Sequence, residues 1–223
     1  MRDLQTLEIF EIEILELLNS IKILDYLYFG GGTMLGLCHN LNRYSTDLDF
    51  WLDTTANAKN IFNTLRDKLT SKYKVTNSEN ACYTILFEIQ SPQYIKKLKI
   101  EIRKDKTDFE WERKIAFSKF TNKQVVVKAL TLNQMMKNKI DAFLSKKLIR
   151  DCFDIEFMFM RGVEIKVTRE EAMKILKIIN DFTPNDYKVK LGEILDSKDR
   201  QIYLKRNFSL LKEELNQILN NPG

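Results

Sequence analysis

The sequence predicts an α+β (mixed α/β) fold, in which a mixed β-sheet flanked by helices precedes a helical domain. In the first part of the 223-residue chain, short apolar and β-branched runs alternate with amphipathic segments of helical period. Beyond about residue 129 the sequence becomes helical, with two capping-box patterns that begin at Thr131 and Thr168. We therefore expect one α/β domain over residues 1–128 and one helical domain over residues 129–223.

Hydrophobic spacing predicts the elements of the first domain. Apolar residues recur every three or four positions over residues 4–21 and 58–69, which is typical of amphipathic helices. An apolar run over residues 23–29 predicts a buried strand, and a short helix should follow the glycines after it. The other predicted strands cover residues 46–52, 73–75, 82–89, 95–103 and 125–127.

Helix-start signals and apolar spacing predict the elements of the second domain. A helix should begin after Thr131, and helical character continues over residues 151–160 to an end near Gly162. Further helices are expected over residues 172–182 and 208–219. The sequence contains no internal repeat or low-complexity segment that would interrupt this organisation.

A glycine-rich corner between the first strand and the short helix carries the clearest chemistry. Glycines let the backbone approach a ligand closely, and the free N–H groups at a helix start suit an anion. Asp47 and Asp49 project from one face of the next strand, where their mutual repulsion favours a cation such as magnesium or manganese. A phosphate cradle beside a metal-binding carboxylate pair is what nucleotidyl transfer requires.

Two other phosphate motifs do not fit this corner. A dinucleotide fingerprint would need glycine at position 35, where the sequence has leucine, and the Gly-Lys-Ser/Thr of a Walker A motif is absent. A plain tight turn and a surface Asp-x-Asp remain the alternatives for each motif taken alone. Their combination is a stronger signal, because Leu48 and Phe50 alternate with the aspartates and suit a buried face.

Two motifs resemble a known family. Gly31-Gly32-Thr33, followed after thirteen residues by Asp47-Leu48-Asp49, resembles the signature of the DNA polymerase β-like nucleotidyltransferases. Downstream, residues 139–143 and 150–154 resemble the AbiEii/AbiGii toxin family of type IV toxin–antitoxin systems. The resemblance spans about residues 20–160. It implies a polymerase β-like core, an NTP substrate and a cognate antitoxin as partner, and related toxins modify the 3′ end of tRNA.

The resemblance also implies a third metal-binding acid on a neighbouring strand. Glu101 occupies the matching position on the predicted strand over residues 95–103, and Glu88 and Asp105 are the alternatives. An acid on an alternating strand can equally face solvent without further function. We expect Asp47, Asp49 and Glu101 to bind Mg²⁺ or Mn²⁺ and to be catalytic.

Basic residues of the second domain form a separate candidate group. Lys139, Lys146 and Arg150 are spaced by seven and four residues, so they share a face if the helix is continuous. They predict a cationic wall that contacts the triphosphate or the acceptor's phosphates, with a solvated basic face as the alternative. Lys139 matches the family's motif lysine and is expected to be catalytic. Asp151 and Asp154 match the motif's acids, which either orient basic side chains or cap the next helix.

The remaining nucleotide-binding candidates lie around the glycine corner. We expect Gly31, Gly32 and Thr33 to hold the phosphates, although the Thr33 hydroxyl could instead act as an N-cap. Arg43 lies between the short helix and the aspartates. It is either a triphosphate contact or an ordinary loop arginine.

Together these residues predict a Mg²⁺- or Mn²⁺-dependent enzyme that transfers a nucleoside monophosphate from an NTP to an acceptor. The resemblance implies a toxin, with the tRNA 3′ end or another nucleic acid as a possible acceptor. The alternatives are transfer onto a protein or a small molecule, and a nucleotide-binding regulatory module without catalysis.

Composition restricts the other possibilities. The net charge of +5 permits a nucleic-acid partner without requiring one. A single histidine and three widely spaced cysteines argue against histidine catalysis, a zinc site and a disulfide framework. No window approaches the roughly 18 apolar residues of a membrane span, and the acidic N-terminus does not resemble a signal peptide. We expect no membrane partner and a cytoplasmic location.

Overall fold

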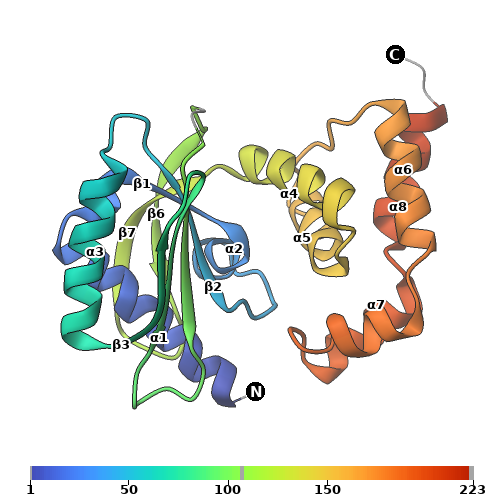
Figure 1. Cartoon of the computed structure of the whole chain (residues 1–223). Helices are drawn as coiled ribbons and strands as arrows, with labels where there is room; N and C mark the ends of the chain where they lie inside the picture. The colour runs from blue at the N-terminus through green and yellow to red at the C-terminus, as the bar shows by residue number, and fades with distance from the viewer. Residues whose placement is uncertain (1, 106–107, 221–223) are drawn as a thin grey trace. The chain divides into compact units, whose positions relative to one another are not determined.

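The computed structural model describes residues 2–105 and 108–220. The chain divides into two compact units, Met1–Thr131 and Leu132–Gly223. The predicted boundary between residues 128 and 129 falls inside the last strand of the first unit. Figure 1 shows the sheet of the first unit with its helices, and the helices of the second unit.

A seven-stranded mixed sheet forms the first unit, in the order β3-β4-β5-β2-β1-β7-β6 (Figure 1). β2 runs antiparallel to β1 and parallel to β5, and β1 runs parallel to β7. The predicted α+β class is therefore confirmed. The strands are Leu27–Gly30 (β1), Asp47–Leu52 (β2), Lys74–Asn80 (β3), Thr84–Gln90 (β4), Leu98–Arg103 (β5), Trp111–Phe117 (β6) and Gln124–Leu130 (β7).

One face of the sheet is buried against helices and the other carries the acidic residues. On β2, Leu48 and Phe50 are fully buried, and on β5 the two isoleucines beside Glu101 are buried in the same way. Because strand side chains alternate, Asp47, Asp49 and Glu101 project from the opposite face. The helices of this unit are Arg2–Ser20 (α1), Gly31–His39 (α2) and Ala58–Lys72 (α3), with a short 3₁₀ turn over Ile23–Tyr26 (η1).

Two parts of the sequence-based description of this unit are wrong. The predicted strand over residues 23–29 begins with η1, because Lys22 adopts a left-handed φ of 60° and a 3₁₀ turn follows it. β6 was not predicted, although it pairs with β7 along its whole length. Its central residues are charged and every second one is exposed, so the apolar signal of a strand is weak there.

The second unit is helical, as predicted. Aromatic side chains from several segments meet in its core, where Phe182, Tyr187 and Phe208 lie with ring centroids 6.0–6.2 Å apart. The predicted capping box at Thr168 is present, with reciprocal bonds to Glu171. The helices are Leu132–Lys146 (α4), Ile149–Phe159 (α5), Arg169–Asn180 (α6), Ser197–Arg206 (α7) and Ser209–Asn220 (α8), with a π-helical turn over Asp186–Lys190 (η2). None of the helices within residues 2–105 and 108–220 is long and apolar enough to span a membrane.

The condition under which Lys139, Lys146 and Arg150 would share a face, one continuous helix, is not met. α4 ends at Lys146, and Lys147 adopts a left-handed φ of 55° before α5 begins. This turn lets α5 pack back against α4 and bury Ile149 inside the helical unit. Arg150 therefore lies on a different helix from the two lysines.

Candidate active site

The glycine corner lies at the junction of β1 and α2, with Gly30 as the last strand residue and Gly31 as the first helical one. Gly31 has a φ of +74°, and a Cβ atom there would collide with Oδ2 of Asp49. A Cβ atom on Gly32 would collide with the guanidinium of Arg43. The corner is therefore lined by a carboxylate over one glycine and a guanidinium over the next, at a helix start that suits an anion.

The strand register brings the three predicted acids together on one face. Asp49 pairs with Gly30 on β1 and with Glu101 on β5. Neighbouring strands lie about 4.8 Å apart, so Glu101 is the nearest β5 residue to Asp49 on that face. Asp47 lies two residues earlier on β2 and pairs with Lys99. The acids are therefore neighbours of one another and of the glycine corner.

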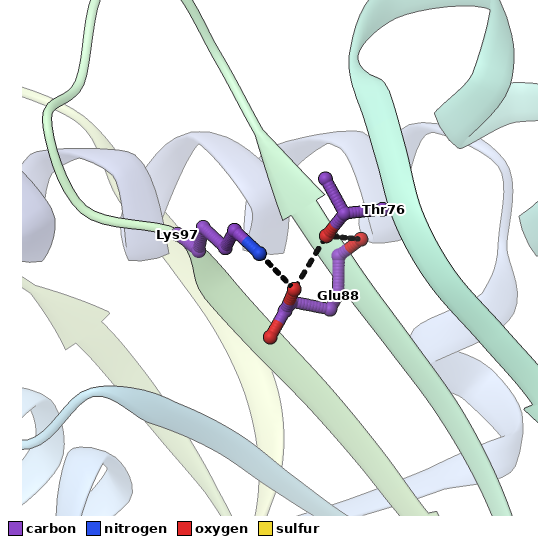
Figure 2. Close-up of polar contacts among 3 residues, drawn as sticks. All are labelled: Thr76, Glu88 and Lys97. Atoms are coloured by element: carbon purple, nitrogen blue, oxygen red, sulfur yellow. Dashed lines mark hydrogen bonds and ion pairs between the residues drawn. The ribbon is translucent and has the colours of Figure 1, made fainter.

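The register also separates Glu101 from the alternative third acids. Glu88 pairs with Lys99 on β5, so it lies one strand further from β2 than Glu101 does. Figure 2 shows its carboxylate held by Lys97, with Nζ 2.6 Å from Oε1, and by the hydroxyl of Thr76. Asp105 is exposed beyond the end of β5. The position of Glu101 beside Asp49 therefore favours Glu101 among the three.

Two cations hold the carboxylate of Glu101. Lys99 Nζ lies 2.6 Å from Oε2, and Arg103 Nε lies 3.4 Å from Oε1. Partial burial opposes the charge of Lys99, but the hydrogen bond to Glu101 and the charges of Glu101, Asp47 and Asp49 together raise its pKa. Lys99 therefore binds Glu101 directly and places a positive charge beside the other two acids.

The donor chemistry of this face fits a divalent metal ion, because carboxylate oxygens from adjacent strands project to the same side. In the part of the chain that the structure describes, no group of three or more histidine, cysteine, aspartate or glutamate side chains is arranged to hold a metal ion.

The motif residues of the second unit meet in its interior. Lys139 Nζ lies 2.8 Å from Oδ1 of Asp151 and 2.7 Å from Oδ2 of Asp154; both aspartates are buried and the lysine side chain is 12% exposed. Of the two predicted roles for the motif's acids, this geometry favours the orientation of Lys139. Lys146 and Arg150 are exposed. The catalytic and nucleotide-binding roles of these residues stay predictions.

A comparison with protein families identifies the chain. The family described as "Nucleotidyl transferase AbiEii toxin, Type IV TA system" matches residues 16–218. The chain belongs to the AbiEii family. The AbiEii chain is accordingly a nucleotidyltransferase, which confirms the predicted enzyme class.

Two solved structures share the fold of the AbiEii chain. The crystal structure of JHP933 from Helicobacter pylori is 18% identical, with a TM-score of 0.56 and coverage of 93% of each chain. A crystal structure described as "putative nucleotidyltransferase from H. pylori" is 18% identical, with a TM-score of 0.55 and coverage of 94% of this chain and 96% of that one. At this identity the likeness concerns the fold alone, and it agrees with the predicted mixed sheet followed by helices. No curated protein sequence matches the AbiEii chain.

A buried glutamate beneath the glycine corner was missed by the sequence analysis. Glu11 on α1 is 3% exposed, and among the described residues its Oε1 has no hydrogen-bond partner. Burial is the largest cause that raises the pKa of Glu11 well above its usual range, and the negative charges of Glu8 and Asp47 raise it further. A hydrogen bond between its carboxyl group and the side chain of Thr33 acts in the opposite direction. The Thr33 hydroxyl itself donates to the backbone oxygen of Asp47 at 2.6 Å. The available signal was the position of Glu11 within the apolar stripe of its helix, four residues after Leu7.

Glu11→Gln is expected to raise the free energy of unfolding at pH 8 by about 1 kcal/mol or more, because an ionised carboxyl is costly in this position. The folded-state pKa of Glu11 is raised, so its favourable contribution is complete below the usual pKa of 4.5 and is lost as the pH rises. Urea unfolding of both proteins between pH 4 and pH 8 measures this. The difference between them should grow with pH, and parallel pH profiles would contradict the assignment.

Gly31→Ala is expected to destabilise the AbiEii chain by about 1–3 kcal/mol, because alanine is strained at positive φ and its Cβ displaces Asp49. We also expect nucleotidyl transfer to fall at least tenfold. Gly36→Ala is the matched control in the same helix, since the nearest atom to its added Cβ beyond the helix's own backbone is Leu41 O at 4.0 Å. This control should be neutral or slightly stabilising. Equal stability and activity for the two variants would show that the corner does not need glycine.

Proposed function

We propose that Asp47, Asp49 and Glu101 bind Mg²⁺ or Mn²⁺ and that the enzyme transfers a nucleoside monophosphate from an NTP to an acceptor, with release of pyrophosphate. The observation that carries this proposal is the register in which Gly30, Asp49 and Glu101 lie side by side on three adjacent strands. It brings a helix N-terminus and a set of carboxylates to one face of the sheet. When bound, the metal ion would polarise the α-phosphorus and offset charge on the leaving pyrophosphate.

The glycine corner is proposed to hold the triphosphate. The N–H groups of Gly31, Gly32 and Thr33 lie in the first turn of α2, where backbone donors have no partner within their own helix. The Thr33 hydroxyl donates to Asp47 O, so the backbone N–H is the group of Thr33 that we assign to phosphate binding. The guanidinium of Arg43 lies over Gly32 and can contact the same phosphates.

The helical unit is proposed to contribute cationic side chains to substrate binding. Lys146 and Arg150 are exposed and can bind phosphates of the nucleotide or the acceptor. Lys139 is the proposed catalytic lysine of this unit, and Asp151 and Asp154 would hold its ammonium in place.

The acceptor that we propose is the 3′ end of tRNA, and the partner is a cognate antitoxin. The family description as a toxin of a type IV system supports the partner, and the net charge of +5 is compatible with a nucleic-acid substrate. Transfer onto a protein or a small molecule, or nucleotide binding without transfer, are the competing outcomes.

The acceptor can be identified by incubating the protein with each α-labelled NTP, Mg²⁺, total tRNA and a protein extract, followed by separation of the products. We expect label in RNA that is lost on ribonuclease treatment. Label in protein or in a small product would move the acceptor to another class. Label in no product, with NTP binding retained, would contradict catalysis.

A further inference from the structure

We propose that Lys99 takes the place of the metal ion in the metal-free protein, and that its ammonium must leave Glu101 before a divalent cation can bind. This inference rests on the proposed function, because it concerns the same three carboxylates. It makes Lys99 a positioning residue that keeps the acids together and weakens metal binding until substrate is present.

The position of Lys99 carries the first step of the inference. It pairs directly with Asp47 across β2 and β5, and its side chain projects from the face that carries Asp49 and Glu101. Its ammonium is 2.6 Å from Oε2 of Glu101. The charges of the two aspartates also act on it. The ammonium therefore binds one carboxylate of β5 directly and carries its positive charge beside the two aspartates of β2.

The second step is competition for the same oxygens. A hard divalent cation binds carboxylate oxygens directly, and it is itself repelled by a nearby ammonium. Oε2 of Glu101 is held by Lys99 and Oε1 by Arg103 at 3.4 Å.

The third step concerns the substrate. A nucleotide brings a triphosphate of about −4 charge to the glycine corner, which offers a displaced ammonium a new partner. Metal ion and NTP should therefore bind together more readily than either alone. Without nucleotide, the protein should bind metal ions weakly because the ammonium of Lys99 repels them and occupies Glu101.

A second lysine–glutamate pair, between the residue before β5 and a residue of β4, provides a matched control. Lys97 Nζ lies 2.6 Å from Oε1 of Glu88, the same distance as in the Lys99–Glu101 pair (Figure 2). Glu88 is on β4, one strand further from the aspartates. Lys97→Met removes the same charge as Lys99→Met, so it corrects for any change in net charge.

The test is Mn²⁺ binding to the full-length protein, measured by electron paramagnetic resonance of free Mn²⁺, without and with NTP. Lys99→Met and Lys99→Gln should bind Mn²⁺ at least tenfold more tightly than the wild type without NTP, and Lys97→Met should match the wild type within twofold. Adding Asp49→Asn to Lys99→Met should abolish the increase in Mn²⁺ affinity. That result would show that the additional Mn²⁺ affinity depends on the carboxylates of β2 and β5.

Unchanged or weaker Mn²⁺ binding in both Lys99 variants would overturn the inference, as would an equal gain in Lys97→Met. Two substitutions at position 99 are included because one of them could fail to fold. Failure of the proposed function has a different signature. In that case the wild type would transfer no label from NTP, whatever the Mn²⁺ affinities of the variants.

Discussion

Asp49→Asn should lower the rate of nucleotidyl transfer by roughly a hundredfold to a thousandfold, which corresponds to about 3–4 kcal/mol of transition-state stabilisation. Asp49 is central in the strand register, with Gly30 on one side and Glu101 on the other. Its Oδ2 lies over Gly31, so the carboxylate lies against the proposed phosphate cradle. The asparagine keeps the shape of the side chain and removes the charge that a divalent cation requires. Steady-state transfer of label from an α-labelled NTP measures the effect.

Asp53→Asn is the matched control for this prediction. Asp53 follows β2, and its carboxylate accepts hydrogen bonds from Tyr28 at 2.8 Å and from Thr55. It therefore has a structural role near the same strand, and transfer should stay within a few-fold of the wild type. Urea unfolding should show that Asp49→Asn is folded. A fully active Asp49→Asn protein would exclude Asp49 from metal binding.

Lys139→Met should destabilise the protein by about 3–5 kcal/mol, because it leaves two buried carboxylates without their cation. The side chains of Lys139, Asp151 and Asp154 are only 12%, 7% and 0% exposed, respectively. The loss of one partner from a buried ion pair is costly, whereas a pair replaced as a whole by apolar side chains can be neutral. Urea unfolding of the full-length chain, monitored by circular dichroism, measures the change.

Two further variants separate charge from packing in this triad. The combined variant Lys139→Met, Asp151→Asn and Asp154→Asn should recover at least half of the lost stability, because no buried charge remains. Lys146→Met, on an exposed residue at the end of the same helix, should change stability by less than about 0.5 kcal/mol. A Lys139→Met protein as stable as Lys146→Met would show that the triad does not stabilise the helical unit.

The central strands and their acidic face were predictable because both follow from the alternation of apolar and polar residues along each strand. Leu48 and Phe50 are buried and the aspartates between them project from the other face, as a period of two requires. The family resemblance also assigned the third acid to Glu101 on a neighbouring strand, although only the register distinguishes it from Glu88. Here the sequence pattern and the tertiary structure agree, because one set of buried residues determines both.

The remaining features depend on contacts between residues that are distant in sequence. The hydrogen bond between Glu11 and Thr33 joins α1 to α2, and the spacing of apolar residues within either helix does not predict it. The break at Lys147 places Asp151 beside Lys139, which a continuous helix would not have done. Lys99 looks like an ordinary exposed lysine in a strand until β2 and β5 are paired. Such features require the fold before they can be interpreted.

The position of the label that the enzyme transfers tests the central claim most directly. The wild type should be incubated in parallel with an α-labelled and a γ-labelled NTP, Mg²⁺ and the acceptor fraction. We predict that the α-label enters the acceptor and that the γ-label is released in pyrophosphate. Both reactions should be much slower with the Asp49→Asn protein. Entry of the γ-label into the acceptor would identify phosphoryl transfer instead, and it would contradict nucleotidyl transfer at the acids of β2 and β5.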